Sequence, residues 1–106
     1  MELDDPLLIK YRDVLRAKGL AEWLDLLAPD AEVLGLIESL RGRTLGEALD
    51  ELSRVAAARI NREAAAEAYA ALFGVRDEDE AVSFLARRLA RWYLGIAEAL
   101  GLIRLR

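Results

Sequence analysis

The sequence predicts an all-α fold: a compact single domain, residues 1–106, built from five to six helices. Apolar residues recur every three or four positions along most of the chain, helix-capping residues precede these segments, and glycines follow them. A chain of 106 residues suits one core, and hydrophobic residues, at 55% of the sequence, are sufficient to fill it. We expect a long C-terminal α-hairpin, about 45–73 and 78–100, with three shorter N-terminal helices packed across it.

The first helix is expected to begin at Pro6. Asp5 is a favoured N-cap residue, and a proline suits the first helical position because its missing N–H has no partner there in any case. Gly19 can end the helix because glycine readily adopts the left-handed backbone conformation. Apolar residues recur at helical spacing between these points: Leu7, Leu8, Tyr11, Val14 and Leu15.

Two further short helices are expected at about 20–28 and 31–41. The first stops there because Pro29 disfavours helical geometry in the residue before it. Asp30 is a cap for the second, and Gly42 follows it. The expected buried face of the first consists of Trp23, Leu24 and Leu27.

The segment 45–73 is expected to form one long helix. Thr44 and Glu47 have the spacing of a capping box, and Gly74 ends the segment. No glycine or proline lies near Asn61, which favours a continuous helix, with at most a bend. A break near Asn61 is the alternative, and it gives six helices in place of five.

The last helix is expected at 78–100, after a start signal formed by Asp77 and Glu80. Its buried seam follows a 3-4 spacing and comprises Val82, Leu85, Leu89, Trp92, Ile96, Ala99 and Ile103. Trp92 is therefore predicted to lie in the core. The alternating stretch LIRLR at 102–106 is the one segment with a strand-like pattern.

The composition argues against most kinds of enzyme. The chain has no histidine and no cysteine, so it lacks the familiar catalytic triads, an imidazole base and the usual haem and zinc ligands. We therefore predict a protein without catalytic residues, cofactor or metal. The acidic run 77–80 suggests a cation site, but consecutive residues at a helix start point in different directions. Acidic residues are also favoured at a helix start, because the N–H groups there form the positive end of the helix dipole. We interpret this run as a helix start.

No membrane association is expected. No apolar run approaches the roughly 20 residues that cross a bilayer, and the acidic N-terminus lacks the features of a secretory signal. These features predict a cytoplasmic protein. The depletion of Asn, Gln and Cys beside many charges is typical of thermostable proteins. The consistent helix signals also fit a de novo designed helical scaffold without biological function.

The favoured function is a non-enzymatic helical interaction or structural module that self-associates or docks on a larger protein. Nine alanines lie between residues 56 and 71, and small side chains let helices approach closely. The seam of the last helix, from Val82 to Ile103, is long enough for antiparallel packing on helix 45–73 or for pairing with another chain. The candidate interface residues are Ala57, Ala64, Ala68, Ala71, Leu89, Ile96 and Ile103.

The alternative function is a small nucleic-acid-associated subunit of a nucleoprotein assembly. Arg87, Arg88 and Arg91 form a basic patch off the predicted seam, and arginines beside aromatic residues suit phosphate contacts and base stacking. The net charge of −4 disfavours this alternative, since phosphate neutralisation drives such binding.

Overall fold

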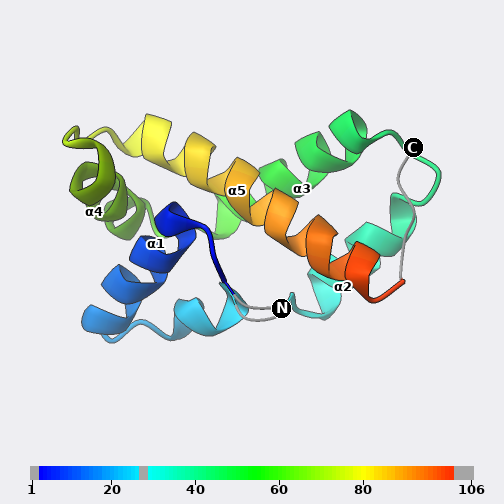
Figure 1. Cartoon of the computed structure of the whole chain (residues 1–106), viewed down its shortest axis with the longest axis horizontal. Helices are drawn as coiled ribbons and strands as arrows, with labels where there is room; N and C mark the ends of the chain where they lie inside the picture. The colour runs from blue at the N-terminus through cyan, green and yellow to red at the C-terminus, as the bar shows by residue number, and fades with distance from the viewer. Residues whose placement is uncertain (1–2, 27–28, 102–106) are drawn as a thin grey trace.

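The protein is described by a computed structural model that covers residues 3–26 and 29–101. Every regular element in this part of the chain is a helix, so the predicted all-α fold is confirmed. The elements are α1 (Pro6–Ala17), the 3₁₀ helix η1 (Ala21–Leu26), α2 (Ala31–Ser39), α3 (Leu45–Arg59), α4 (Arg62–Phe73) and α5 (Glu78–Ala99) (Figure 1). The strand-like stretch 102–106 lies outside the described residues.

The helices begin where the sequence predicts because local side chains satisfy their first N–H groups. The side chains of Asp5, Asp30, Thr44 and Asp77 each accept a hydrogen bond from a backbone N–H in the first turn that follows, over 2.9 to 3.2 Å. Such a cap stabilises a helix by about 1 kcal/mol. These four helix starts depend on residues two or three positions apart, which is why the sequence alone locates them.

The predicted continuous helix over 45–73 is wrong, and the six-element alternative is correct. Helix α3 ends at Arg59, Ile60 is extended with φ −75° and ψ 132°, and α4 begins at Arg62. The side-chain oxygen of Asn61 accepts the N–H of Ala64 over 3.0 Å, which starts the new helix. The backbone N–H of Asn61 donates to the hydroxyl of Tyr11 over 3.0 Å, so α1 supplies the partner that a continuous helix would have supplied.

The second predicted helix is a six-residue 3₁₀ helix in place of an α-helix over 20–28. Leu24, expected on the buried face, is exposed, whereas Leu26 is buried. The indole N–H of Trp92 donates to the carbonyl oxygen of Leu26 over 2.9 Å, which joins the end of η1 to the core. Trp23 is half-buried, and Leu27 lies outside the described residues.

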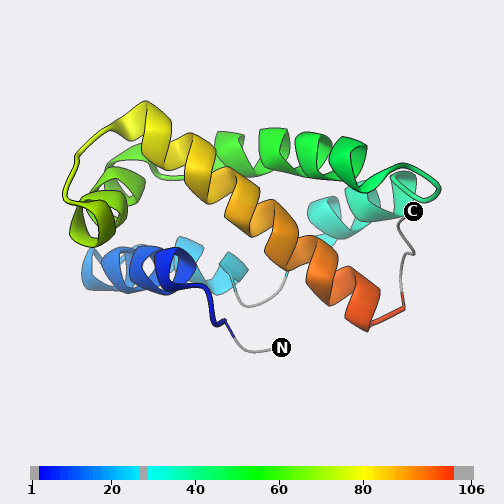
Figure 2. The same ribbon diagram turned by 45° about the horizontal axis from the view of Figure 1, so that its top comes forward.

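Helix α5 is the central element of the fold, since it contacts α1, α2, α3 and α4. Helices α3 and α5 run in opposite directions and form the expected α-hairpin-like pair (Figures 1 and 2). Helix α4 leaves the end of α3 and packs against α1 and α5. The largest fully buried side chains come from four different helices: Leu8, Leu15, Val33, Ile37, Leu52 and Leu85.

None of the helices in the described ranges combines the length and the apolar character that a bilayer-spanning segment needs.

Candidate functional site

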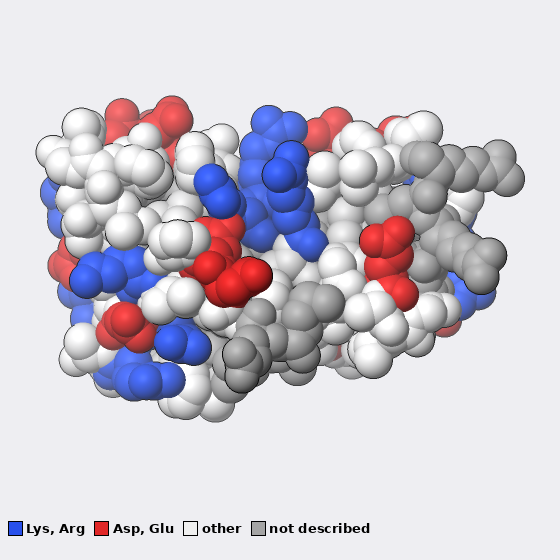
Figure 3. Space-filling view, viewed as in Figure 1, with Lys and Arg blue, Asp and Glu red and all other residues white. Residues whose placement is uncertain are grey.

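The exposed face of α5 carries the most distinctive surface feature of the protein. Phe84, Arg87, Arg88 and Arg91 are spaced at i, i+3, i+4 and i+7, which places them on one helix face. Together with Leu49 of α3 they line an open groove of about 360 Å³. Basic side chains gather over the middle of the molecule in this view (Figure 3). We call this feature the arginine groove.

The predicted division between the solvent-exposed and buried faces of α5 is confirmed around this groove. The three arginines are exposed, and Trp92 is buried, with 8% of its surface accessible. Near the end of α5 the predicted seam departs from the buried face: Ile96 is half-buried and Ala99 is exposed, whereas Tyr93, Leu94 and Ala97 are buried. The arginines therefore occupy the side of the central helix that faces solvent.

Through its guanidinium, Arg88 is bound by two other residues of the chain, Asp5 and Phe84. Its Nη1 donates to Oδ2 of Asp5 over 2.8 Å, a typical length for a charge-assisted hydrogen bond. Its guanidinium also lies over the ring of Phe84, with Cζ 4.9 Å from the ring centroid. Because the other carboxylate oxygen of Asp5 accepts the Leu7 N–H, Asp5 joins the start of α1 to α5. Arg88 thus helps to hold α1 against the central helix.

Arg87 and Arg91 have much weaker ion-pair contacts within the chain. The closest acid to Arg87 is Asp50, with Nη2 and Oδ1 4.0 Å apart and both side chains about 70% exposed. An ion pair this long and this exposed contributes little. Among the residues that the structure describes, no acid lies within ion-pair distance of Arg91. Two cations four positions apart on a helix repel each other by a few tenths of a kcal/mol, and a bound anion would relieve this repulsion.

An exposed apolar surface adjoins the arginine groove, and the sequence prediction missed it. Leu72, Phe73 and Val75 are 39%, 50% and 57% exposed around the end of α4, and we call them the apolar tip. The ring of Phe73 lies 4.7 Å from that of Tyr69 and 5.7 Å from that of Phe84, between centroids. The signal in the sequence was the run LFGV, which places large apolar residues on both sides of a helix-ending glycine.

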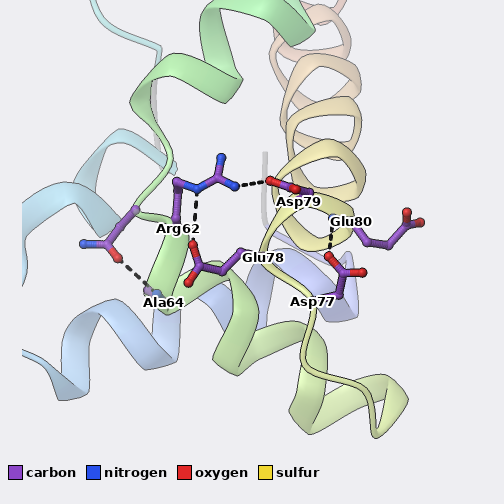
Figure 4. A network of polar contacts seen from close by, with 7 residues as sticks. Arg62, Ala64, Asp77, Glu78, Asp79 and Glu80 are labelled. Atoms are coloured by element: carbon purple, nitrogen blue, oxygen red, sulfur yellow. Dashed lines mark hydrogen bonds and ion pairs between the residues drawn. The ribbon is translucent and has the colours of Figure 1, made fainter.

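The acidic run at the start of α5 forms ordinary helix-start contacts (Figure 4). Asp77 caps the helix by accepting the N–H of Glu80 over 3.1 Å. Arg62, at the start of α4, binds Oε1 of Glu78 through Nε over 3.2 Å and binds Asp79 through Nη2. Within the described ranges, no group of three potential ligand residues is arranged to hold a metal ion. Two of the four carboxylates are therefore ion-paired and one caps the helix.

Three predicted interface residues lie in the core of this chain. Ala64 and Ala68 on α4 are fully buried, and Leu89 on α5 is 5% exposed. All three belong to the single hydrophobic core, in which α4 packs against α1 and α5. The small alanine side chains thus allow close packing between helices of the same chain.

The other predicted interface residues differ in their exposure. Ala57 on α3 and Ile96 on α5 are half-buried, and Ala71 on α4 is exposed. Ile103 lies outside the described residues. The structure therefore does not bring the six described residues together on one free surface, and the role of all seven in an interface stays a prediction.

A smaller, partly open pocket lies between α1, η1, α3 and α5. It has a volume of about 30 Å³, and its lining includes Tyr11, Glu22 and Arg59. Burial raises the pKa of the Tyr11 hydroxyl from 10.0 to about 12, because the phenolate is poorly solvated there. The cavity has room for one or two water molecules and is too small for a substrate.

The serines offer no evident nucleophile. The hydroxyl oxygen of Ser53 is buried and has no hydrogen-bond partner among the described residues, and Ser83 is exposed. A serine nucleophile needs a base within hydrogen-bond reach. The arginine groove therefore remains the strongest candidate for a functional site.

Comparisons with models of protein families, with curated proteins and with solved structures find no match to this chain.

Proposed function

We propose that this chain is a non-enzymatic, cytoplasmic binding module that docks on a larger protein, which inserts an acidic segment into the arginine groove. The observation that carries the proposal is the lack of a close acidic partner for Arg87 and Arg91 among the described residues. Their guanidinium groups line an open groove, yet one has only a long contact with an exposed acid and the other has no ion-pair partner in the described part of the chain. Carboxylates of a partner would complete these contacts, often with two parallel hydrogen bonds.

The walls of the groove suit a polypeptide. Leu49 and Phe84 line the groove together with the guanidinium groups and supply apolar contacts. Glutamate and aspartate side chains carry methylene groups as well as charge, so they fit a groove that is both cationic and apolar. Arg88 is already bound to Asp5, and it fixes one edge of the groove in advance. A preformed site loses less conformational entropy on binding.

The same geometry weighs against the nucleic-acid alternative. Base stacking needs exposed aromatic rings, but Trp92 and Tyr93 are buried. The ring of Phe84 is in contact with the guanidinium of Arg88 and with two other aromatic rings. Trp92 and Tyr93, which follow Arg91 in the sequence, are therefore not available to stack with a base, and the half-exposed ring of Phe73 lies outside the groove, against Phe84. We therefore favour an acidic protein segment as the ligand.

Docking on a different protein predicts that the chain alone is monomeric. Ala64, Ala68 and Leu89 already fill the core of the chain, so they are not available to a second copy. We expect size-exclusion chromatography with light scattering to give the monomer mass of 11.8 kDa at low and at high salt. A stable dimer at both salt concentrations would contradict this expectation and would favour self-association through Ala71 and Ile96.

The proposal is tested with a fluorescein-labelled peptide of eight glutamates. We expect saturable binding at low salt, measured by fluorescence anisotropy, and weaker binding as salt is added. The substitution Arg91→Gln removes one charge while keeping a good helix former, and we expect it to weaken binding roughly threefold to tenfold. Arg43→Gln is the matched control, because Arg43 is exposed, lies outside the groove and pairs with Glu47.

Two results would contradict the proposal. The first is no binding of the acidic peptide at low salt, and the second is equal weakening by Arg91→Gln and by the control Arg43→Gln. A labelled single-stranded oligonucleotide of equal charge serves as the competing ligand. If it binds more tightly than the peptide and depends on Arg87 and Arg91, the nucleic-acid alternative replaces the proposal.

A further inference from the structure

We infer that the segment bound by the arginine groove also carries a large apolar side chain, which sits on the apolar tip formed by Leu72, Phe73 and Val75. This inference rests on the proposed function and specifies the chemistry of the partner. Acidic residues would lie over Arg87 and Arg91, and an aromatic or branched aliphatic residue would lie over the tip.

The two surfaces are continuous through one side chain. Phe84 lines the arginine groove, and its ring lies 5.7 Å from that of Phe73, between centroids. Tyr69 packs against both rings, at 4.7 Å from Phe73 and 6.1 Å from Phe84. A segment that leaves the groove along Phe84 therefore meets Phe73 next.

The apolar tip is held in place before any partner binds. The ring contacts of Phe73 with Tyr69 and Phe84 restrain it, although half of its surface is exposed. Gly74, with φ +74°, turns the backbone at the end of α4, and its N–H donates to the carbonyl oxygen of Ala70 over 2.8 Å. An apolar side chain that binds here would cover surface that is already ordered, at little additional cost in entropy.

The charges on α5 set the direction of the bound segment. Asp77 is the N-cap of α5 and Glu80 lies in its first turn, two and five positions after Val75 of the apolar tip, and both are exposed. The four acids of residues 77–80 outnumber Arg62 and Arg76, the two cations beside them, so this end of the helix repels carboxylates. Arg87 and Arg91 lie two to three turns further along and attract them. The acidic part of the partner is therefore directed to the groove, and the apolar part to the tip.

The distances limit the spacing within the segment. Arg91 follows Phe84 by seven positions, which corresponds to about 10 Å along a helix that rises 1.5 Å per residue. Phe73 lies a further 5.7 Å from Phe84, between ring centroids. An extended peptide advances about 3.3 Å per residue, so roughly three to five residues separate the apolar residue from the carboxylate over Arg91.

The inference is tested with two labelled peptides of equal charge. Each has six glutamates followed by three serines, and the tenth residue is phenylalanine in one and serine in the other. We expect the phenylalanine peptide to bind wild-type protein roughly fivefold to tenfold more tightly, because partial burial of its ring removes apolar surface from water. The substitution Phe73→Ser should abolish this gain, whereas Leu45→Ser should retain it, since Leu45 is equally exposed at the start of α3.

A second variant removes part of the apolar tip at a position outside the helices, where a substitution is less able to disturb folding. Val75 lies between α4 and α5, outside both helices, so Val75→Ser removes part of the tip without a change inside a helix. It should reduce the gain roughly twofold to threefold, since Val75 supplies one of the three apolar side chains. Circular dichroism and thermal melting establish that each variant is folded before binding is measured.

The outcomes separate the inference from the proposed function. If both peptides bind equally well and Arg91→Gln weakens both, the arginine groove binds acidic segments but the inference about the apolar tip is overturned. The same conclusion follows if phenylalanine tightens binding but Phe73→Ser and Val75→Ser do not reduce the gain. If neither peptide binds at low salt, the proposed function itself fails.

Discussion

The substitution Leu85→Ala is expected to lower the free energy of unfolding by about 2 to 5 kcal/mol. Leu85 is 1% exposed and lies on α5, the helix that contacts α1, α2, α3 and α4. Truncation removes buried methyl groups and leaves a cavity that rigidly packed neighbours fill only in part. A domain of this size has a total stability of about 5 to 15 kcal/mol, so the loss is a large fraction of it.

Urea unfolding followed by far-ultraviolet circular dichroism measures this effect. Leu24→Ala is the matched control, because the same side chain is removed from an exposed position in η1. We expect the control to change the free energy of unfolding by less than about 0.5 kcal/mol. A loss below 1 kcal/mol for Leu85→Ala, with the slope of the urea dependence unchanged, would be at odds with a core centred on α5.

The substitution Tyr11→Phe is expected to cost about 1 to 3 kcal/mol of stability at neutral pH. It removes the hydroxyl that accepts the Asn61 N–H over 3.0 Å and leaves this partly buried N–H without its partner. The contact links α1 to the break between α3 and α4, so the loss should act on the arrangement of three helices. Tyr69→Phe is the control, because the ring of Tyr69 remains in its aromatic contacts.

Tyr11 should also make stability depend on pH in the alkaline range. Burial raises its pKa from 10.0 to about 12 in the folded state, so the neutral phenol is favoured by folding. This contribution is fully present below pH 10 and is lost as pH rises from 10 to about 12, because the unfolded chain releases the proton first. Each pKa unit corresponds to about 1.4 kcal/mol, so the loss approaches about 3 kcal/mol.

The difference between wild type and Tyr11→Phe isolates this effect from the lysines and other tyrosines that titrate in the same range. We expect urea unfolding at pH 8, 10 and 11 to show a stability difference that shrinks as pH rises. A constant difference would mean that the Tyr11 hydroxyl has an ordinary pKa in the folded protein and is not isolated from solvent.

The sequence located the four helices whose local caps were identified in it, but the prediction missed Asn61, whose side chain also acts locally by accepting the Ala64 N–H. Asp5, Asp30, Thr44 and Asp77 cap helices through atoms only two or three residues away, so the pattern of the chain contains the whole interaction. The exposed position of the α5 arginines followed from helical periodicity in the same way. In both cases the geometry of one helix is sufficient to define which groups meet.

The tertiary structure decided the features that depend on distant residues. Asn61 breaks the long helix because Tyr11, fifty positions earlier, supplies a hydrogen-bond acceptor. Leu26 in place of Leu24 turns inward because η1 ends against Trp92, sixty-six positions later. No spacing rule within one helix contains either of these distant partners, although the Asn61 cap of α4 is itself local and was overlooked in the prediction of a continuous 45–73 helix.

The candidate site shows the same division. The sequence alone determined that Arg87, Arg88 and Arg91 share the solvent face of one helix, since their spacing is helical. Only the tertiary structure decided that Arg88 is bound by Asp5, eighty-three positions away, while Arg91 has no acid in reach within the described residues. Helical periodicity defines which side of a helix a charge occupies, whereas the packing of helices determines which opposite charge comes near it.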